Sequence, residues 1–352
     1  MRRAAVATAL LGLAGCRSPT WNFGRYRTPE VVEQRSGVTA DLRAVAAVDE
    51  ETAWASGTGG TWLRTVDGGR TWTSGDVPGA GQLDFRSLAA FDARRAIVLS
   101  AGSPARMFRT GDGGATWREA YRNDEPEIFF DALRFADQSR GYALGDPIAG
   151  RFVLLETTDG GDTWTRLPGP EAMPGEGAFA ASNSALAVRG DLLWFGTGGS
   201  VARVFRSTDR GRTWSVTAVP APSGAPSRGV FSLDVVSELR GVLVGGDYQA
   251  PDEPGAFATT EDGGVTWTAG EPPRGYRSSV VYLGGIRLVA TGTSGTDSTE
   301  IVGWWRRKPT EPGSSETNGW QSIGPGMNAV SRWCAVGPQG RVARVYAHQR
   351  GP

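Results

Sequence analysis

The sequence predicts an all-β fold, a seven-bladed β-propeller whose blades carry Asp-box hairpins and whose ring is closed by an N-terminal strand. Three observations lead to this prediction. One octapeptide recurs five times, its tryptophans follow one another at intervals of 45 to 53 residues, and short apolar segments recur in the same order around it. Such a spacing suits a four-stranded propeller blade. The 51 glycines and 21 prolines among 352 residues fit many short strands joined by turns.

The octapeptide, here called the Asp box, has the pattern Ser/Thr-x-Asp-x-Gly-x-Thr-Trp. Glycine permits the positive φ of a tight hairpin, the aspartate can accept hydrogen bonds from amides of its own turn, and the tryptophan can bury a large apolar face between sheets. The structural residues of the five boxes are Asp67, Asp112, Asp159, Asp209 and Asp262, with Trp72, Trp117, Trp164, Trp214 and Trp267. Calcium binding is the alternative role, but the boxes lack the further oxygen ligands of a calcium loop, so no metal is expected.

An apolar inner strand is expected in each blade. These strands begin at Leu42, Phe85, Phe130, Gly177, Gly229, Tyr276 and Asn328. The last blade supplies only three strands from its own segment, and residues 31–36 belong to no first blade. We therefore expect residues 31–36 to pair with the C-terminal blade and close the ring. The propeller then spans 31–352, and the polar residues 306–319, next to a decayed sixth box ending at Trp320, form a surface insertion.

The first sixteen residues are expected to be a bacterial lipoprotein signal peptide. Arg2 and Arg3 precede a short apolar stretch that ends in Leu13-Ala-Gly-Cys16 and is too short to span a bilayer. Cys16 would then carry the lipid, and residues 17–30 would be a tether. An ordinary secretory signal is the alternative. Both place the protein outside the cytoplasm, and Arg17 after Cys16 favours the outer membrane or periplasm if the cell is Gram-negative.

The composition disfavours several classes of function. The formal net charge is zero, so no nucleic-acid partner is expected. The chain has one histidine, His348, and Cys334 has no cysteine to pair with once Cys16 is lipidated. Histidine-based triads and histidine zinc sites are therefore disfavoured. The glycine-rich segments at 57–60 and 196–199 lie between strands and not before a helix, so no nucleotide cofactor is expected.

A candidate site follows from propeller geometry. The starts of the inner strands and the loops after the second strands converge on one face, the funnel, and convergent openings are where ligands bind. Tyr248 is expected on this face, together with the candidate partner-binding residues Arg43, Arg86, Asp131, Asp146, Glu176, Asp247, Tyr276 and Arg277. Arginine forks bind carboxylates with two hydrogen bonds. The alternative is that these charges neutralise one another and bind no ligand.

Several motifs resemble the photosystem II stability/assembly-factor family of Asp-box (BNR repeat) propellers. They are Leu42-Arg43, residues 53–57 and residues 65–72. Residues 84–86, 144–147, 174–179 and 205–214 more closely resemble the family's non-photosynthetic bacterial lipoprotein branch. The resemblance extends from about residue 31 to 345. It implies a non-catalytic, monomeric protein that binds a protein or peptide partner in assembly or quality control of a membrane complex. The resemblance does not imply that this chain acts at a photosystem.

A sialidase-like glycoside hydrolase is the alternative, because sialidases are also Asp-box propellers. Arg43, Arg86 and Arg277 could bind the substrate carboxylate, Tyr276 with Glu176 could be the nucleophile pair, and Asp131 could be the acid/base. The sialidase Arg-Ile-Pro signature, however, is present only as Arg27-Thr28-Pro29 in the expected tether. The sequence thus favours a binding protein and leaves enzymatic activity open.

Overall fold

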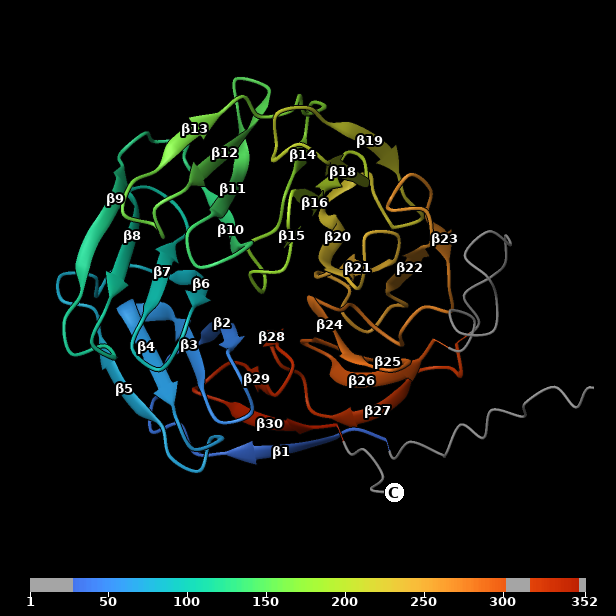
Figure 1. Ribbon diagram of the computed structural model, residues 1–352. Coiled ribbons are helices and arrows are strands. Elements are labelled where there is room, and N and C mark those ends of the chain that lie inside the picture. Colours follow the sequence, from blue (N-terminus) through green and yellow to red (C-terminus); the bar gives the residue numbers. More distant parts are fainter. Residues whose placement is uncertain (1–27, 302–316, 348–352) are drawn as a thin grey trace, which may run out of the picture.

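The computed structural model describes residues 28–301 and 317–347. They form seven antiparallel sheets arranged radially around a central axis, which confirms the predicted propeller (Figure 1). The expected signal peptide, Cys16, most of the tether and most of the insertion lie outside the described residues. Within the described ranges, no helix is long and apolar enough to cross a membrane.

Blades 1 to 3 each consist of four consecutive strands. Blade 1 contains β2 (Leu42–Ala47), β3 (Ala53–Gly57), β4 (Thr61–Thr65) and β5 (Thr73–Asp76), with the 3-10 turn η1 (Thr58–Gly60) between β3 and β4. Blade 2 contains β6 (Phe85–Ala90), β7 (Ala96–Ser100), β8 (Ala105–Thr110) and β9 (Arg118–Asn123). Blade 3 contains β10 (Phe130–Phe135), β11 (Gly141–Ile148), β12 (Arg151–Thr157) and β13 (Thr165–Leu167).

Blades 4 to 7 complete the ring. Blade 4 contains β15 (Leu186–Arg189), β16 (Leu192–Gly196), β18 (Arg203–Ser207) and β19 (Ser215–Ala218). Blade 5 contains β20 (Ala225–Val235), β21 (Gly241–Asp247), β22 (Ala256–Thr260) and β23 (Thr268–Ala269), extended by β17 (Gly198–Gly199) and β14 (Glu176–Gly177). Blade 6 contains β24 (Ser279–Gly284), β25 (Arg287–Gly292), β26 (Gly295–Glu300) and β27 (Gln321–Gly324). Blade 7 contains β28 (Ala329–Val330), β29 (Cys334–Val336), β30 (Val342–Tyr346) and β1 (Glu30–Gln34).

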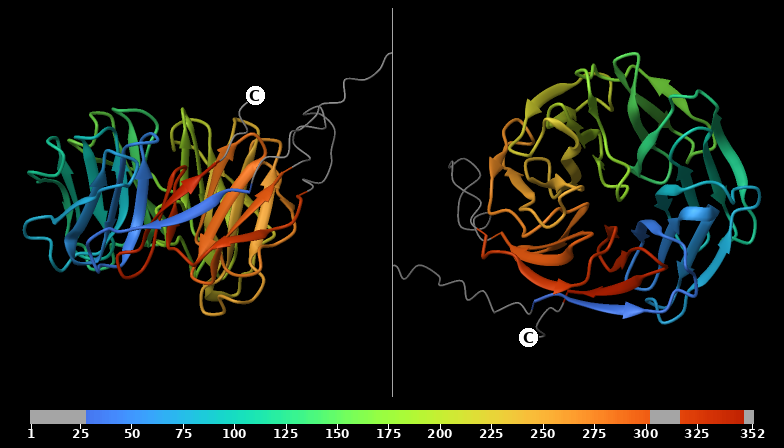
Figure 2. Two further views of the ribbon diagram at one scale, coloured as in Figure 1. Left: turned by 90° about the horizontal axis from the view of Figure 1, so that it is seen from below. Right: turned by 180° about the vertical axis from the view of Figure 1, so that it is seen from behind.

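The outer strand of blade 7 comes from the other end of the chain. Strand β1 runs antiparallel to β30, with Glu30 opposite Tyr346 and Gln34 opposite Val342. Figure 2 shows the two strands side by side at the rim. The pairing covers the edge of β30 and gives the C-terminal blade its fourth strand, so the predicted ring closure is confirmed.

The five Asp boxes share one hydrogen-bond pattern. In the first, the Thr71 amide donates to Oδ1 of Asp67 at 2.9 Å and its hydroxyl donates to Oδ2 at 2.6 Å. Oγ1 of Thr65 accepts from the Gly69 amide at 2.8 Å. The two bonds from Thr71 lower the pKa of the Asp67 carboxyl to about 2. The aspartates therefore fix the turns as charged acceptors.

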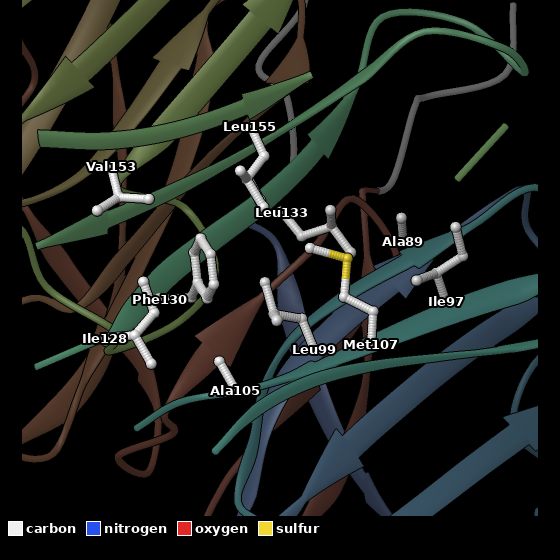
Figure 3. Close-up of a cluster of buried hydrophobic side chains, with 11 residues drawn as sticks. Ala89, Ile97, Leu99, Ala105, Met107, Ile128, Phe130, Leu133, Val153 and Leu155 are labelled. Carbon is white, nitrogen blue, oxygen red and sulfur yellow. The ribbon is translucent and has the colours of Figure 1, made fainter. Parts of the chain in front are cut away.

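The tryptophans pack between blades, as predicted. Each of the five box tryptophans, and Trp320 in the sixth blade, contacts a buried cluster drawn from its own blade and the preceding one. Figure 3 shows the cluster between blades 2 and 3, where Leu99 and Met107 face Phe130 and Leu133. Trp164 packs against the edge of this cluster. Burial of large apolar surfaces between neighbouring sheets is thus the main interaction that holds the ring together.

Blade 4 differs from the expectation at its inner strand. We expected residues 177–180 there, but the inner strand is β15, Leu186–Arg189. Gly177 belongs instead to the two-residue strand β14, which pairs with β17 at the side of blade 5. The residues at 177–180 are apolar or small, as in an inner strand, so their composition alone did not distinguish the two placements.

The intervening residues 178–185, here called the channel segment, enter the centre of the ring (Figure 1). Asn183 is fully buried, donates to the Leu88 carbonyl in blade 2 and accepts from the Leu133 amide in blade 3, both at 2.7 Å. The Ser182 hydroxyl donates to the Ser278 carbonyl in blade 6 at 2.6 Å. Asn183 has φ of +66°, a conformation that asparagine adopts more readily than most residues. The channel segment therefore joins blades on different sides of the axis.

Candidate partner-binding site

Four inner strands carry a β-bulge at the same place, near their start on the funnel face. The bulged residues are Arg43 in β2, Arg86 in β6, Asp131 in β10 and Phe231 in β20. A bulge changes the direction in which a side chain points, and bulges often occur next to binding sites. The repeat thus directs a set of large or charged side chains toward one region.

Glycine opposite the bulge permits this geometry. In blade 1, a Cβ on Gly57 would lie 2.2 Å from the carbonyl oxygen of Asp41. In blade 3, a Cβ on Gly145 would lie 2.6 Å from the carbonyl oxygen of Phe129. The glycine opposite the entry to the bulge is therefore required by the close approach of the chain there.

Arg43 and Arg86 bring two positive charges together at the funnel. Burial lowers the pKa of Arg43, and the neighbouring Arg86 lowers it further, while Asp84 and Tyr276 act in the opposite direction. Arg86 forms a salt bridge with Asp84 at 2.6 Å. Nε of Arg43 is buried and has no hydrogen-bond partner within the described part of the chain. Nε of Arg43 is thus a donor that remains available to an anion at this arginine pair.

An aromatic cluster adjoins the arginines. Phe179 of the channel segment stacks on Phe231 with ring centroids 3.7 Å apart, and Tyr276 meets Phe231 edge-on at 4.7 Å. Tyr248 also packs edge-on against Phe231, at 6.2 Å, and is an exposed aromatic residue. Burial raises the pKa of Tyr276 well above its usual value, so its hydroxyl stays protonated. The cluster offers an apolar surface beside the guanidinium groups.

Two carboxyl groups lie on the blade 3 side. Asp131 is fully buried, and neither carboxyl oxygen has a hydrogen-bond partner among residues 28–301 and 317–347. Burial, and then repulsion from Asp146, raise the pKa of Asp131 well above its usual range, although Arg86 opposes the shift. Burial also raises the pKa of Asp146 to about 6, against a hydrogen bond that its Oδ1 accepts from the Ala178 amide at 3.0 Å. Burial without a hydrogen-bond partner thus favours the neutral form of Asp131.

Three of the candidate residues are occupied by other partners. Glu176 accepts from Nε of Arg203 at 2.9 Å and from the Thr197 hydroxyl at 2.6 Å. Arg277 forms a buried salt bridge with Asp297, and Asp247 pairs with Arg228 at 2.8 Å. The charges of these three residues are thus neutralised by partners within the protein, as in the alternative considered from the sequence. The structure brings Arg43, Arg86, Asp131 and Tyr276 together, with Asp146 beside Asp131, and their role in binding remains a prediction.

An open hollow of about 450 Å³ lies on the same face, between blade 3 and the added strands of blade 5. Its walls combine aromatic and proline side chains with glycine backbone, and include Phe129, Asp146, Pro147, Phe179, Gly198 and Pro226. The residues that our reading of the sequence missed are Phe179 and Phe231. Phe231 could have been found, because it occupies the same position in its inner strand as Arg43 and Arg86 do in theirs.

No group of three or more metal-ligating side chains occurs within the described residues. The arrangement of fold and funnel defines an Asp-box β-propeller with a cationic, partly aromatic mouth. Residues 82–226 match the sequence family described as "Photosynthesis system II assembly factor YCF48". Over these residues the chain is similar to that family.

Several solved structures share the fold. YCF48 bound to a D1 peptide is 15% identical, with a TM-score of 0.56 over 92% of this chain and 98% of that one. The GH74 xyloglucanase from Xanthomonas campestris is 13% identical, with a TM-score of 0.56 over 84% of this chain and 56% of that one. The WD40 repeats of RRP9 are 10% identical, with a TM-score of 0.62 over 91% of this chain and 100% of that one. No curated protein sequence matches the chain.

Proposed function

We propose that this chain is a non-catalytic binding protein that recognises a peptide segment of a partner protein at the funnel. The observation that carries the proposal is the Arg43–Arg86 pair, where two guanidinium groups adjoin and Nε of Arg43 has no partner within the described residues. Hydrogen bonds between a guanidinium and a carboxylate are among the stronger ones in proteins. The ligand group is therefore a carboxylate, from an acidic side chain or a chain terminus.

The aromatic cluster supplies the second half of the recognition. Tyr276 lies near Arg43, Phe231 packs against both Tyr276 and Tyr248, and Tyr248 is exposed. Aromatic and arginine side chains are the residues that most often dominate binding energies at protein interfaces. A peptide with an apolar or aromatic residue next to its carboxylate would contact both halves.

Two lines of support come from outside the funnel. YCF48, with which the chain shares its fold, has been solved with a bound D1 peptide. The sequence also carries the lipobox-like ending at Cys16 and the polar tether that follows it. We therefore propose a monomeric, lipid-anchored protein outside the cytoplasm that takes part in the assembly or quality control of a membrane complex.

A glycoside hydrolase is the competing function, because the GH74 xyloglucanase shares the propeller fold and this chain spans 56% of that enzyme's length. The candidate catalytic groups do not fit such a role. The Tyr276 hydroxyl has a raised pKa, and Glu176 is bound by Arg203. A panel of fluorogenic sialosides and glycosides tests the point: turnover that is lost in Tyr276→Phe would establish the enzyme and overturn the binding proposal.

The binding proposal is tested with fluorescent peptides. A library that varies acidic residues, aromatic residues and a free or amidated C-terminus is titrated against the purified protein by fluorescence polarisation. We expect binding to require the carboxylate and to weaken at least tenfold in Arg43→Ala/Arg86→Ala, since a hydrogen bond to a charged group contributes about 1.5–3 kcal/mol.

Arg122→Ala is the matched control. Arg122 lies on the outer strand β9 of blade 2, where it pairs with Asp124. The variant should bind as the wild type does. Equal affinity of the wild type and the double variant for every peptide would show that the arginine pair is not the binding surface. Capture of membrane proteins with the wild type, the double variant and Arg122→Ala then identifies the natural partner.

A further inference from the structure

A second cavity lies at the other end of the central channel, on the face that carries the Asp-box turns. Its volume is about 250 Å³, and it is lined by residues near the ends of the inner strands. The funnel is lined by residues near the starts of the same strands. Between the two levels, Asn183 of the channel segment bonds to Leu88 and Leu133. The cavity is therefore a site separate from the funnel.

The wall of this cavity, here called the valine cavity, is mostly aliphatic. Six valines from five different blades line it, namely Val45, Val188, Val235, Val280, Val281 and Val330. Val45, Val280 and Val330 are buried, and the other three are half-buried. Such a surface favours a branched aliphatic group over a polar one.

Two opposite charges interrupt the apolar wall. Arg134 of β10 donates from Nε to the Leu186 carbonyl at 3.3 Å, and Asp234 of β20 accepts from the Tyr282 amide at 2.7 Å. The charge of each residue shifts the pKa of the other, but the two form no salt bridge within the described residues. Arg332 also acts on Asp234 as a positive charge.

Arg134 and Asp234 are half-buried in the cavity wall, and burial disfavours the charged form of each. Burial lowers the pKa of Arg134 and raises the pKa of Asp234, and in each case the opposite charge offsets only part of the effect. A buried charge is stabilised when a hydrogen-bonded counter-charge is brought to it. A ligand that carries both a carboxylate and an ammonium group would supply one to each.

We propose that the valine cavity binds a free amino acid with a branched aliphatic side chain. Its α-carboxylate would pair with Arg134, its α-ammonium group with Asp234, and its side chain would contact the valines. The size agrees, since 250 Å³ corresponds to about eight water molecules at ~30 Å³ each in the liquid, which is the scale of leucine or valine. The site lies outside the funnel, so it does not depend on the function proposed above.

Isothermal titration calorimetry of the purified protein tests this. The probes are L-leucine, L-valine, glycine, 4-methylpentanoate, which lacks the ammonium group, and isoamylamine, which lacks the carboxylate. We expect saturable binding of leucine and valine, and at least tenfold weaker binding of the other three, because each lacks one of the three interactions. Absence of binding for leucine and valine at millimolar concentration would overturn the proposal, and so would equal binding of 4-methylpentanoate or isoamylamine.

Two variants locate the site. Asp234→Asn keeps an acceptor for the Tyr282 amide, so it should fold, weaken leucine binding at least tenfold and leave the affinity for 4-methylpentanoate unchanged. Val281→Phe narrows the cavity from a half-buried position and should weaken leucine and valine alike. Asp252→Asn, on an exposed loop, is the control and should bind as the wild type does. Undiminished leucine binding in both Asp234→Asn and Val281→Phe would place the ligand elsewhere and refute the assignment.

Discussion

Oε1 of Gln34, in the N-terminal strand, accepts a hydrogen bond from the indole nitrogen of Trp72 in the first Asp box at 3.3 Å. Nε2 of the same side chain donates to the Gly68 carbonyl of that box at 3.1 Å. Strand β1 therefore completes blade 7 and also contacts the first box of blade 1. The joint that closes the ring is built from three parts of the chain.

Removal of β1 should weaken the ring. A chain that starts at residue 36 loses the β1–β30 ladder and leaves β30 as an open edge. With several backbone hydrogen bonds lost at about 0.5–1.5 kcal/mol each, we expect a loss on the order of 3 kcal/mol in the free energy of unfolding, and self-association. Chemical denaturation and size-exclusion chromatography measure both. A chain that starts at residue 28 is the control, and unchanged stability of the shorter chain would contradict the role of β1.

The Asp boxes should make stability depend on acid pH. Hydrogen bonds from the hydroxyl and amide of Thr116 lower the pKa of Asp112 to about 2, below its unfolded value near 3.9. A lowered pKa stabilises the fold above the unfolded value, and this contribution is lost as the pH falls through about 2. Asp112→Asn should therefore be less stable than the wild type at pH 6, with a deficit that shrinks toward pH 2. Thermal unfolding across this range checks it, and a deficit independent of pH would argue against the charge.

Asp131 should have the opposite dependence. Its pKa is raised by burial, so the folded state takes up a proton above the unfolded pKa. The stabilisation is then complete below about pH 3.9 and is lost as the pH rises toward the raised value. Asp131→Asn should unfold at a higher temperature than the wild type at pH 7, by roughly 2 °C or more for a gain of about 1 kcal/mol. The advantage should vanish at pH 3.5. A lower unfolding temperature at pH 7 would show that the Asp131 carboxylate is charged and has a partner.

The channel segment should contribute to the stability of the ring through Asn183. Asn183→Ala leaves the Leu133 amide and the Leu88 carbonyl buried without partners, at about 1–3 kcal/mol each, so we expect a loss of roughly 2–6 kcal/mol. Asn183→Asp retains the acceptor for Leu133 and separates the two contributions. Urea denaturation provides the measurement. A loss below about 1 kcal/mol in Asn183→Ala would mean that the segment relaxes to restore both hydrogen bonds.

The sequence was sufficient for most of the architecture because the repeated parts have strong local signals. A box such as residues 65–72 fixes its turn through its own hydrogen bonds, and its tryptophan fixes the spacing of the blades. Blade 4 was the exception. Residues 177–180 have the small and apolar character of an inner strand, and only their long-range contacts direct them into the channel.

The site was less predictable, because it depends on which partner each charge finds. Arg277 and Arg43 look alike near the starts of their inner strands, yet Arg277 meets Asp297 from β26 and Arg43 meets Arg86. Such pairings join residues on neighbouring strands or blades, and no local motif marks them. Arg134 and Asp234 were missed for the same reason, although each lies three positions after the bulged residue of its inner strand.

The hydrogen bonds of the channel segment have a mechanical consequence. Blades 2, 3 and 6 are each bonded to residues 182–183, so outward movement of one of them must strain bonds that reach the others. We therefore expect the molecule to resist flattening into an oval more strongly than a ring with a hollow axis. A pull applied at one point of the rim would be distributed across the diameter.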